Sequence, residues 1–239
     1  MADAAPFGAG AARAPRPLAV DAVLFDLDGT LVDTAPDLVR AVNRVRTDRG
    51  LDPLPFAALR PYASHGARGL LAAGMAVTPD DADYVALRDA FLDHYAAALC
   101  IESALFEQME SLLAAIEARA LRWGIVTNKA SRFTAPLLDA LGLARRAATV
   151  VCGDTTAHAK PHPAPLLHAA AELGVRPERC IYVGDAERDI AAGIAAGMHT
   201  IVARYGYIQP DEFPDAWPAD GHIAEPVALL AWLPERRSR

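Results

Sequence analysis

The chain has 239 residues, a formal net charge of −7, and a composition that is 53% hydrophobic and 22% charged. This length predicts one or two domains, and the apolar fraction is large enough for a core, which excludes wholesale disorder. The acidic balance argues against non-specific binding of nucleic acid, which needs a basic surface, but it permits a small anionic substrate held by a few local cations.

The chain begins with a segment rich in Ala, Pro and Gly, residues 1–17, which lacks the hydrophobic block of a secretory signal. We expect a flexible N-terminal extension there, with no catalytic role. No apolar run approaches the ~18 residues that a membrane span requires. The cysteines Cys100, Cys152 and Cys180 are widely spaced and odd in number, which predicts free thiols rather than disulfides or a zinc site. We therefore expect a cytoplasmic protein with no membrane partner.

The first predicted strand covers residues 19–25, a mostly apolar run of the kind that is covered on both faces in a parallel sheet. A helix is expected at residues 36–48, with Thr34 and Asp37 as a capping-box-like pair at its start. Residues 50–55 break this helix, and residues 56–99 are Ala-rich and helical in pattern, with a turn predicted at residues 64–69. The helical block at residues 35–105 separates the first strand from the others, and we predict that it forms an inserted cap.

After residue 105, predicted helices and strands alternate. The helices cover residues 110–119, 131–142, 163–173, 187–197 and 227–233, and the strands cover residues 122–127, 148–151, 180–183 and 199–203. Ser131 is the candidate N-cap of its helix and Gly142 its stop. Strands separated by helices of this length form βαβ units. We therefore predict an α/β fold: a doubly wound parallel sheet, Rossmann-like, built from residues 18–34 and 106–239 and carrying a small all-α cap domain.

Carboxylates follow two of the predicted strands. Asp26 and Asp28 come at the end of the first strand, and Asp185 follows the strand at residues 180–183, with Asp189 four residues later. Ligands of open parallel sheets bind beyond the carboxyl ends of the strands, so these four acids should converge on one crevice. Carboxylates this close repel one another unless a cation lies among them. An all-oxygen site without Cys or His favours a hard cation, which predicts Mg²⁺ as the cofactor.

Other polar residues are expected to face these acids across the crevice. Thr127 and Asn128 end the strand at residues 122–127, and Lys160 lies in the loop that follows the strand at residues 148–151. A hydroxyl, an amide and an ammonium group together suit the binding of phosphate oxygens. Phosphoryl transfer requires positioning, neutralisation of charge and an in-line attacker, and a carboxylate attacker gives an aspartyl-phosphate intermediate. The set therefore predicts phosphoryl-transfer chemistry.

Four ordered motifs carry a family resemblance. Asp26-Leu27-Asp28-Gly29-Thr30, Thr127-Asn128, Lys160-Pro161 and Gly184-Asp185-x-x-x-Asp189 resemble the motifs of the haloacid dehalogenase-like phosphatase superfamily, over about residues 20–233. The phrases LFDLDGTLVDTAPDL, GIVTNK, KPHPAPLLHAA and YVGDAERDI are most similar to its phosphoglycolate phosphatase branch. The sequence departs from relatives at Phe106-Glu107-Gln108-Met109, where they often have an aromatic-Pro-Gly turn at the hinge.

The resemblance implies catalytic roles for three residues. Asp26 would be the nucleophile and a direct metal ligand. Asp28 would protonate the leaving alkoxide and then act as the base that activates water, and its backbone carbonyl would also bind Mg²⁺. Lys160 would balance charge between the phosphate and Asp26.

The resemblance also implies the ligands of the phosphate and of the metal. Thr127 and Asn128 would hold the phosphate. Asp185 would complete the metal shell, with Asp189 supporting it.

The predicted cap contributes two candidate substrate-binding residues, His65 and Arg68. In one interpretation, residues 64–68 form a loop that closes over the core site, and the forked guanidinium of Arg68 binds a substrate carboxylate. In the other, these residues form a turn between helices and their side chains are solvated. Arg60 is a weaker second candidate.

The leading functional hypothesis is a Mg²⁺-dependent phosphatase acting on a small phosphorylated metabolite, best guessed as 2-phosphoglycolate. N-acetylmuramic acid 6-phosphate or another sugar phosphate is the nearest alternative substrate. A phosphomutase of the β-phosphoglucomutase kind shares all four motifs and stays open. A catalytically silent binding module is a different class of alternative, but none of the motif acids or Lys160 is lost. We expect a monomer or homodimer and no nucleic-acid partner.

Overall fold

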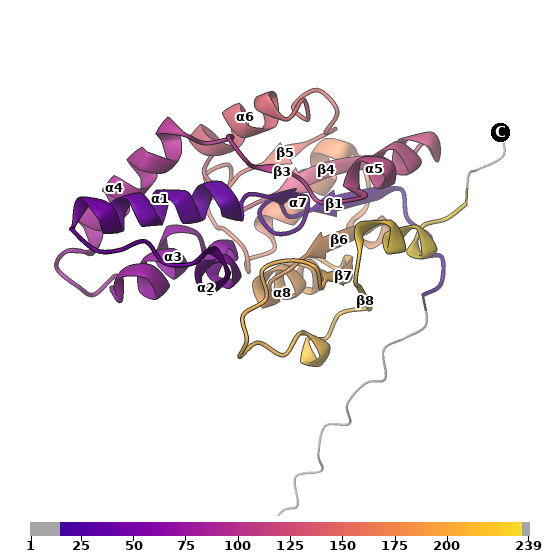
Figure 1. The fold of residues 1–239 in the computed structure, drawn as a ribbon. Helices are drawn as coiled ribbons and strands as arrows, with labels where there is room; N and C mark the ends of the chain where they lie inside the picture. Colours follow the sequence, from indigo (N-terminus) through magenta and orange to yellow (C-terminus); the bar gives the residue numbers. More distant parts are fainter. Residues whose placement is uncertain (1–14, 236–239) are drawn as a thin grey trace, which may run out of the picture.

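The structure is a computed structural model and describes residues 15–235 (Figure 1). Residues 1–14 of the predicted N-terminal extension lie outside the described residues. Residues 15–17 are exposed and belong to no helix or strand. No helix within the described range is long and apolar enough to cross a membrane.

A sheet of six parallel strands forms the core of the described residues, in the order β5-β4-β1-β6-β7-β8. The strands are β1 (Ala22–Phe25), β4 (Arg122–Val126), β5 (Val150–Val151), β6 (Cys180–Gly184), β7 (His199–Ala203) and β8 (Gly221–Ile223). The helices that connect them are α5 (Met109–Ala118), α6 (Ser131–Ala140), α7 (Ala164–Leu173) and α8 (Glu187–Ala195). The 3₁₀ helices η2 (Pro177–Arg179) and η3 (Pro214–Ala216) lie within the connections between strands, and η4 (Pro226–Trp232) follows β8.

Both faces of the sheet are covered, because successive side chains of a strand point to opposite faces. Val23 and Phe25 of β1 join a core cluster that contains residues of α5, α6 and η4. Ala22 and Leu24 of the same strand join a second cluster with residues of α7 and α8. The prediction of a doubly wound parallel sheet is therefore confirmed.

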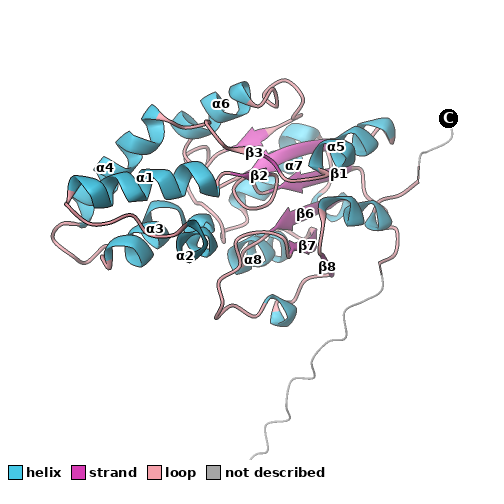
Figure 2. Cartoon of the chain, in the orientation of Figure 1, coloured by secondary structure: helices cyan, strands magenta, loops and turns pink. Residues whose placement is uncertain are grey.

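Helices inserted after β1 form a separate bundle to one side of the sheet (Figure 1). They are α1 (Ala35–Asp48), α2 (Phe56–Leu59), η1 (Arg60–His65), α3 (Gly66–Met75) and α4 (Tyr84–Ala97). Their apolar side chains, including Val42, Leu70 and Phe91, gather in a cluster of their own. The chain enters and leaves this bundle through the antiparallel pair β2 (Val32–Asp33) and β3 (Ala104–Leu105), seen where the bundle meets the sheet in Figure 2. The predicted helical cap is present.

Asp37 ties the start of the cap to its end. Its buried carboxylate accepts hydrogen bonds from the backbone N–H groups of Ile101 and Ser103 (3.0 and 2.9 Å) and from the Ser103 hydroxyl (2.6 Å). The predicted pairing of Thr34 with Asp37 is therefore wrong. Thr34 does precede α1, but its hydroxyl donates to Asp28 instead (2.5 Å). Both side chains form hydrogen bonds with residues outside the first turn of α1 instead of the predicted helix-capping pair.

Several predicted boundaries also differ from the structure. Ser131 is the first residue of α6 rather than its N-cap, because its hydroxyl donates to Asp154 (2.7 Å). The predicted turn at residues 64–69 is instead the junction between η1 and α3, where Gly66 adopts a φ of 55°. The last predicted helix is the 3₁₀ helix η4, and β2, β3 and β8 were not predicted. Strands of two or three residues are too short to show an alternating pattern.

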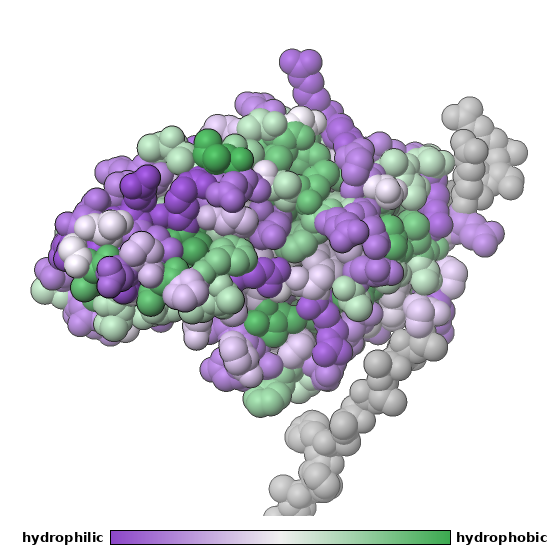
Figure 3. Space-filling view, viewed as in Figure 1, coloured by the Kyte–Doolittle hydropathy of each residue, from purple (hydrophilic) through white to green (hydrophobic). Residues whose placement is uncertain are grey.

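The surface seen in Figure 3 mixes polar residues with separate small groups of apolar ones. Exposed large apolar side chains such as Ile101 and Phe213 lie far apart in the sequence. Single exposed apolar residues are normal for a folded domain.

Gln108 lies directly before α5, as its N-cap, and adopts a φ of 67°. Because the left-handed region is unfavourable for residues with a Cβ, Gln108→Gly should raise the free energy of unfolding by about 0.5–1 kcal/mol. This corresponds to an increase in Tm of about 1–4 °C in thermal denaturation. Ala114→Gly is the matched control, because it places Gly on the exposed face inside α5 and should lower the stability by about 1 kcal/mol. Equal losses in both variants would contradict the prediction.

Candidate active site

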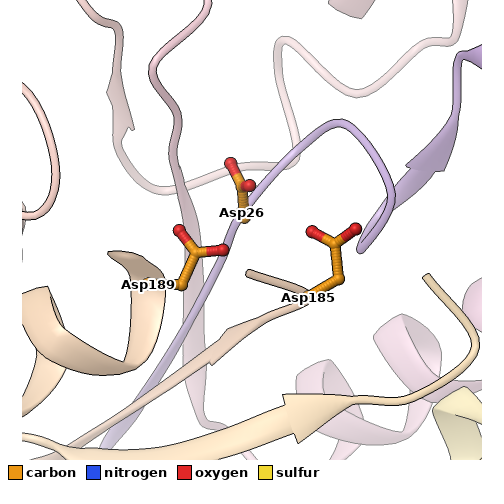
Figure 4. Close-up of side chains that lie close together, drawn as sticks. All are labelled: Asp26, Asp185 and Asp189. Atoms are coloured by element: carbon orange, nitrogen blue, oxygen red, sulfur yellow. The ribbon is translucent and has the colours of Figure 1, made fainter. Parts of the chain in front are cut away.

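Three buried carboxylates meet at the carboxyl ends of two neighbouring strands (Figure 4). Asp26 follows β1, Asp185 follows β6, and Asp189 lies in the first turn of α8. Each offers an oxygen within 4.8 Å of the others. β1 and β6 are paired in register, with Phe25 opposite Val183, so the fold itself places the first two acids side by side. Four carboxylates were expected to converge, and the side chains of these three do.

Asp185 is held by contacts from several directions. Its Oδ2 accepts hydrogen bonds from the Ser64 hydroxyl (2.6 Å) and the Tyr207 backbone N–H (2.8 Å), and its Oδ1 lies 3.3 Å from the Thr30 hydroxyl. A Cβ on Gly29 would lie 2.2 Å from that Oδ2, and one on Gly206 would lie 2.3 Å from the Asp185 Cβ. Glycine at both positions is therefore what lets two loops close around this carboxylate.

Lys160 lies beneath the acids with a completely buried side chain. Its Nζ is 2.9 Å from Asp26 Oδ1 and 2.8 Å from Asp189 Oδ1, and it also donates to the Tyr182 hydroxyl (2.6 Å). Asn128 fixes its backbone: the side-chain amide donates to the Lys160 carbonyl and accepts from the Lys160 N–H, both at 2.9 Å. The Asn128 side chain is therefore engaged with the Lys160 backbone, and Asn128 also lines the pocket described below.

Asp28 lies apart from the three acids and faces a different cation. Its Oδ1 is 2.9 Å from Lys129 Nζ and accepts the hydrogen bond from Thr34. The ring of Tyr95, from the cap helix α4, covers Lys129 at 4.6 Å from Nζ to the centroid. Burial lowers the pKa of Lys129, but the charge of Asp28 and the contact with Tyr95 outweigh this and raise it above the usual value. Lys129 therefore stays charged beside Asp28, whose expected contact with a metal through the backbone carbonyl remains a prediction.

A pocket of about 860 Å³ lies between the core and the cap. Asp26, Asp28 and Thr127 line it from the core, and His65 and Arg68 line it from the cap, so the structure brings these predicted site residues to one space. Asp185, Asp189 and Lys160 do not belong to the lining residues and lie behind it. Leu38, Phe91, Leu92 and Phe133 supply an apolar wall.

Three residues at this site were not assigned a role from the sequence. They are the cations Lys129 and Arg188 of the core and Ser64 of the cap. Lys129 follows Thr127-Asn128 directly, and Arg188 precedes Asp189, so their places within two of the motifs were a usable signal. Nothing in the sequence around Ser64 points to Asp185, which lies 121 residues away.

Burial and mutual repulsion disfavour the ionised forms of Asp26 and Asp185. Burial raises the pKa of Asp185 to about 7, and the charges of Asp26 and Asp189 add to this effect. Burial also raises the pKa of Asp26 to about 6, against the opposing effect of Lys160. A cation among these oxygens would favour the ionised forms. The donor set, all carboxylate oxygen and buried, fits Mg²⁺.

Asp185→Asn should remove the cost of ionising this buried carboxyl in the metal-free protein. A carboxyl whose pKa is raised on folding stabilises the folded state less as pH rises, here from about 4 to about 7. Relative to the unchanged protein, the variant should therefore gain on the order of 2–4 kcal/mol of stability between about pH 4 and pH 8. Chemical denaturation in EDTA measures this difference.

Added Mg²⁺ is the control for that measurement. At about pH 8 it should stabilise the unchanged protein and have little effect on the Asp185→Asn variant, because ligand binding to the folded state raises stability. A stability difference that does not change with pH would contradict the charge argument.

A parallel sheet wound on both faces, covered by a helical cap and carrying acids at its strand ends, defines a capped α/β enzyme. The sequence matches the family model described as haloacid dehalogenase-like hydrolase over residues 20–197. The chain belongs to the haloacid dehalogenase-like hydrolase family, which confirms the resemblance.

Relatives agree on the reaction class. The chain is 42% identical to an N-acetylmuramic acid 6-phosphate phosphatase of Pseudomonas aeruginosa, over 87% of this chain and 92% of that protein. It is 45% identical to a phosphoglycolate phosphatase of Xanthomonas campestris pv. campestris, over 89% of this chain and 95% of that protein. The solved structure of a predicted phosphoglycolate phosphatase from Haemophilus somnus has a TM-score of 0.77 at 26% identity and covers 88% of this chain and 96% of its own. The protein is a phosphatase of this family, as predicted.

Proposed function

We propose that this protein is a Mg²⁺-dependent phosphomonoesterase that hydrolyses a small phosphorylated metabolite through a phosphoryl group carried transiently by Asp26. One observation carries the proposal: the Asp26 carboxylate lies at the floor of the cap-covered pocket, against Lys160 and beside two further acids. A nucleophilic carboxylate needs such positive charge nearby, because the phosphoryl group it attacks is itself anionic.

The proposed chemistry has two steps. In the first, an oxygen of Asp26 bonds to phosphorus while the bond from phosphorus to the substrate oxygen breaks, and Asp28 gives its proton to that leaving oxygen. In the second, Asp28 takes a proton from water as the water oxygen bonds to phosphorus, and the Asp26–phosphorus bond breaks to release inorganic phosphate.

The remaining predicted residues position these groups. Thr127, buried at the end of β4, and the backbone N–H of Asn128 are proposed to bind the phosphate oxygens. Asp26, Asp185 and the backbone carbonyl of Asp28 are proposed to hold Mg²⁺, with Asp189 fixing Lys160 beside them. The ion would supply positive charge to the phosphoryl oxygens and to the acids.

Two substrates have support. 2-Phosphoglycolate, the substrate named for several relatives, carries a carboxylate that suits Arg68 at the cap side of the pocket. N-acetylmuramic acid 6-phosphate also carries a carboxylate, and the pocket volume of about 860 Å³ favours a body of sugar size over a two-carbon acid. Arg68 forms no ion pair within the described part of the chain, so its guanidinium is available for either carboxylate.

Arg68→Ala should separate a carboxylate contact from a structural role. We expect KM for 2-phosphoglycolate or N-acetylmuramic acid 6-phosphate to rise by about 10- to 100-fold, since a charge-assisted hydrogen bond contributes about 1.5–3 kcal/mol. KM for p-nitrophenyl phosphate, which lacks a carboxylate, should change little. Equal small changes for all three substrates would rule out the carboxylate contact.

A substrate panel tests the proposed function. It compares kcat/KM for 2-phosphoglycolate, N-acetylmuramic acid 6-phosphate and common sugar phosphates, with activity lost in EDTA and restored by Mg²⁺. Conversion of glucose 1-phosphate with its phosphate retained would instead identify a phosphomutase. No turnover of any phosphorylated compound would favour the silent binding module and contradict the proposal.

Three further proposals concern the domain boundaries, the cellular location and the oligomeric state of the protein. We propose that residues 35–105 are the cap domain and that residues 18–34 and 106–239 are the catalytic domain. We also propose a cytoplasmic location, supported by three cysteines that are all free thiols, and a monomeric or homodimeric state.

A further inference from the structure

The cap touches the core directly beside the acids, through the 3₁₀ helix η1 and mainly through Ser64. The Ser64 hydroxyl donates to Asp185 Oδ2 (2.6 Å), and the Ser64 backbone carbonyl accepts a hydrogen bond from the Arg188 guanidinium (2.7 Å). Arg60, at the other end of η1, donates to the backbone carbonyls of Gly206 and Tyr205, both at 3.3 Å. One short segment of the cap therefore contacts both a carboxylate of the acid group and the loop that holds it.

The two oxygens of Asp185 have different surroundings. Oδ2 accepts two short hydrogen bonds, from Ser64 and from the Tyr207 backbone, whereas Oδ1 has one long contact with the Thr30 hydroxyl (3.3 Å). Donors on one oxygen fix the plane of a carboxylate and leave the other oxygen for a ligand. The Tyr207 N–H and the two close glycines belong to the core, but the Ser64 hydroxyl belongs to the cap and can act only when the cap is closed.

We propose that Ser64 is a positioning residue that couples cap closure to cation binding, by fixing the orientation of Asp185 from the cap side. This inference rests on the Mg²⁺ site of the proposed function. Hydrogen-bond partners of metal-binding carboxylates orient the ligand, and their loss typically weakens metal affinity by about 10- to 100-fold. Because coupling between two equilibria is reciprocal, the bound cation should in turn favour the closed cap.

The coupling has a consequence for the order of events. An open cap lacks the Ser64 donor, so the open enzyme should bind Mg²⁺ more weakly than the closed one. The Arg188 contact with the Ser64 carbonyl holds the same residue from its backbone, which keeps the hydroxyl aimed at Asp185. The site is thus most complete when the cap excludes water from the pocket.

Calorimetric titration with MgCl₂ alone, without substrate, tests the proposal on the full-length chain. Ser64→Ala should raise the Kd for Mg²⁺ by about tenfold or more, and Ser64→Thr, which keeps a hydroxyl, should restore most of the affinity. Ser131→Ala is the matched control: its hydroxyl also donates to an aspartate, Asp154, but at an exposed position outside the acid group. The control should leave the Kd unchanged.

Hydrogen–deuterium exchange of the η1 backbone gives a second readout that does not depend on affinity. Mg²⁺ should slow exchange at residues 60–66 in the unchanged protein and should have a smaller effect in Ser64→Ala at saturating Mg²⁺. A Kd within twofold of the unchanged protein, equal weakening in the Ala and Thr variants, or equal protection of η1 would overturn the proposal. Neither measurement uses a substrate. Failure of this proposal can therefore be told apart from failure of the proposed function, which the substrate panel tests.

Discussion

Asp26→Asn should abolish turnover, with kcat reduced by at least about 10⁴-fold, because an amide is nearly isosteric with a carboxylate but is a poor nucleophile. The fold should survive. The backbone N–H of Leu27 donates to Asp26 Oδ1 (2.7 Å), and an amide oxygen can accept the same bond. Lys160 keeps its second partner, Asp189. Phosphate release under saturating substrate and Mg²⁺ measures the loss.

The stability of the Asp26→Asn variant serves as its control. Burial already disfavours the charged form of Asp26, whose pKa is raised to about 6, so an uncharged replacement should not lower Tm at about pH 8. Turnover within tenfold of the unchanged protein would show that another group attacks phosphorus. If the variant loses activity because it unfolds, a second experiment tests the nucleophile. The unchanged protein, mixed with substrate, should form a chain phosphorylated at Asp26 that can be trapped.

Lys160→Met should destabilise the protein by about 3–5 kcal/mol at about pH 8 as well as reduce turnover by at least about 10³-fold. Methionine has a similar volume, so the loss comes from charge. Lys160 Nζ contacts Asp26 and Asp189. Without it these buried acids and Asp185 face one another, and Arg188 remains as a nearby cation. Urea denaturation in EDTA measures the stability.

The pH dependence and a second lysine separate charge from packing. The destabilisation by Lys160→Met should shrink toward about pH 5, because the acids then take up protons and lose their repulsion. Lys129→Met is the matched control: it removes one ion pair to the less buried Asp28 and should destabilise the protein less. A loss that is the same at both pH values, or equal in both variants, would show that packing dominates.

The regular part of the fold could be predicted from local patterns. The apolar run that ends at Asp26 predicted a buried strand, and β1 is completely buried. The alternation after residue 105 predicted the helices and the longer parallel strands. These features can be predicted because burial of one or both faces of an element makes hydrophobic residues recur at regular spacing over many consecutive positions. The convergence of Asp26 with Asp185 followed from a rule about parallel sheets that needs no knowledge of side-chain positions.

Such patterns could not predict short elements or the hydrogen-bond partners of side chains. The two-residue strands β2 and β3 show no period, yet they form the connection between cap and core. Thr34 and Asp37 matched a local capping pattern, but each found a stronger partner elsewhere, in Asp28 and in residues 101–103. A hydrogen bond to a buried or part-buried carboxylate outweighs one to a helix terminus that water can also reach.

By itself, the amino-acid sequence determined the fold class, the order of the four motifs and the residue types at the strand ends, because these depend on local periodicity and on the carboxyl-end rule. Only the tertiary structure decided which partners those residues take. It separated Asp28, paired with Lys129, from the other three acids, turned the Asn128 side chain to Lys160, and brought Ser64 of the cap onto Asp185. Such contacts join residues up to 121 positions apart, and packing of the whole chain, rather than any local preference, sets the few ångströms on which a hydrogen bond depends.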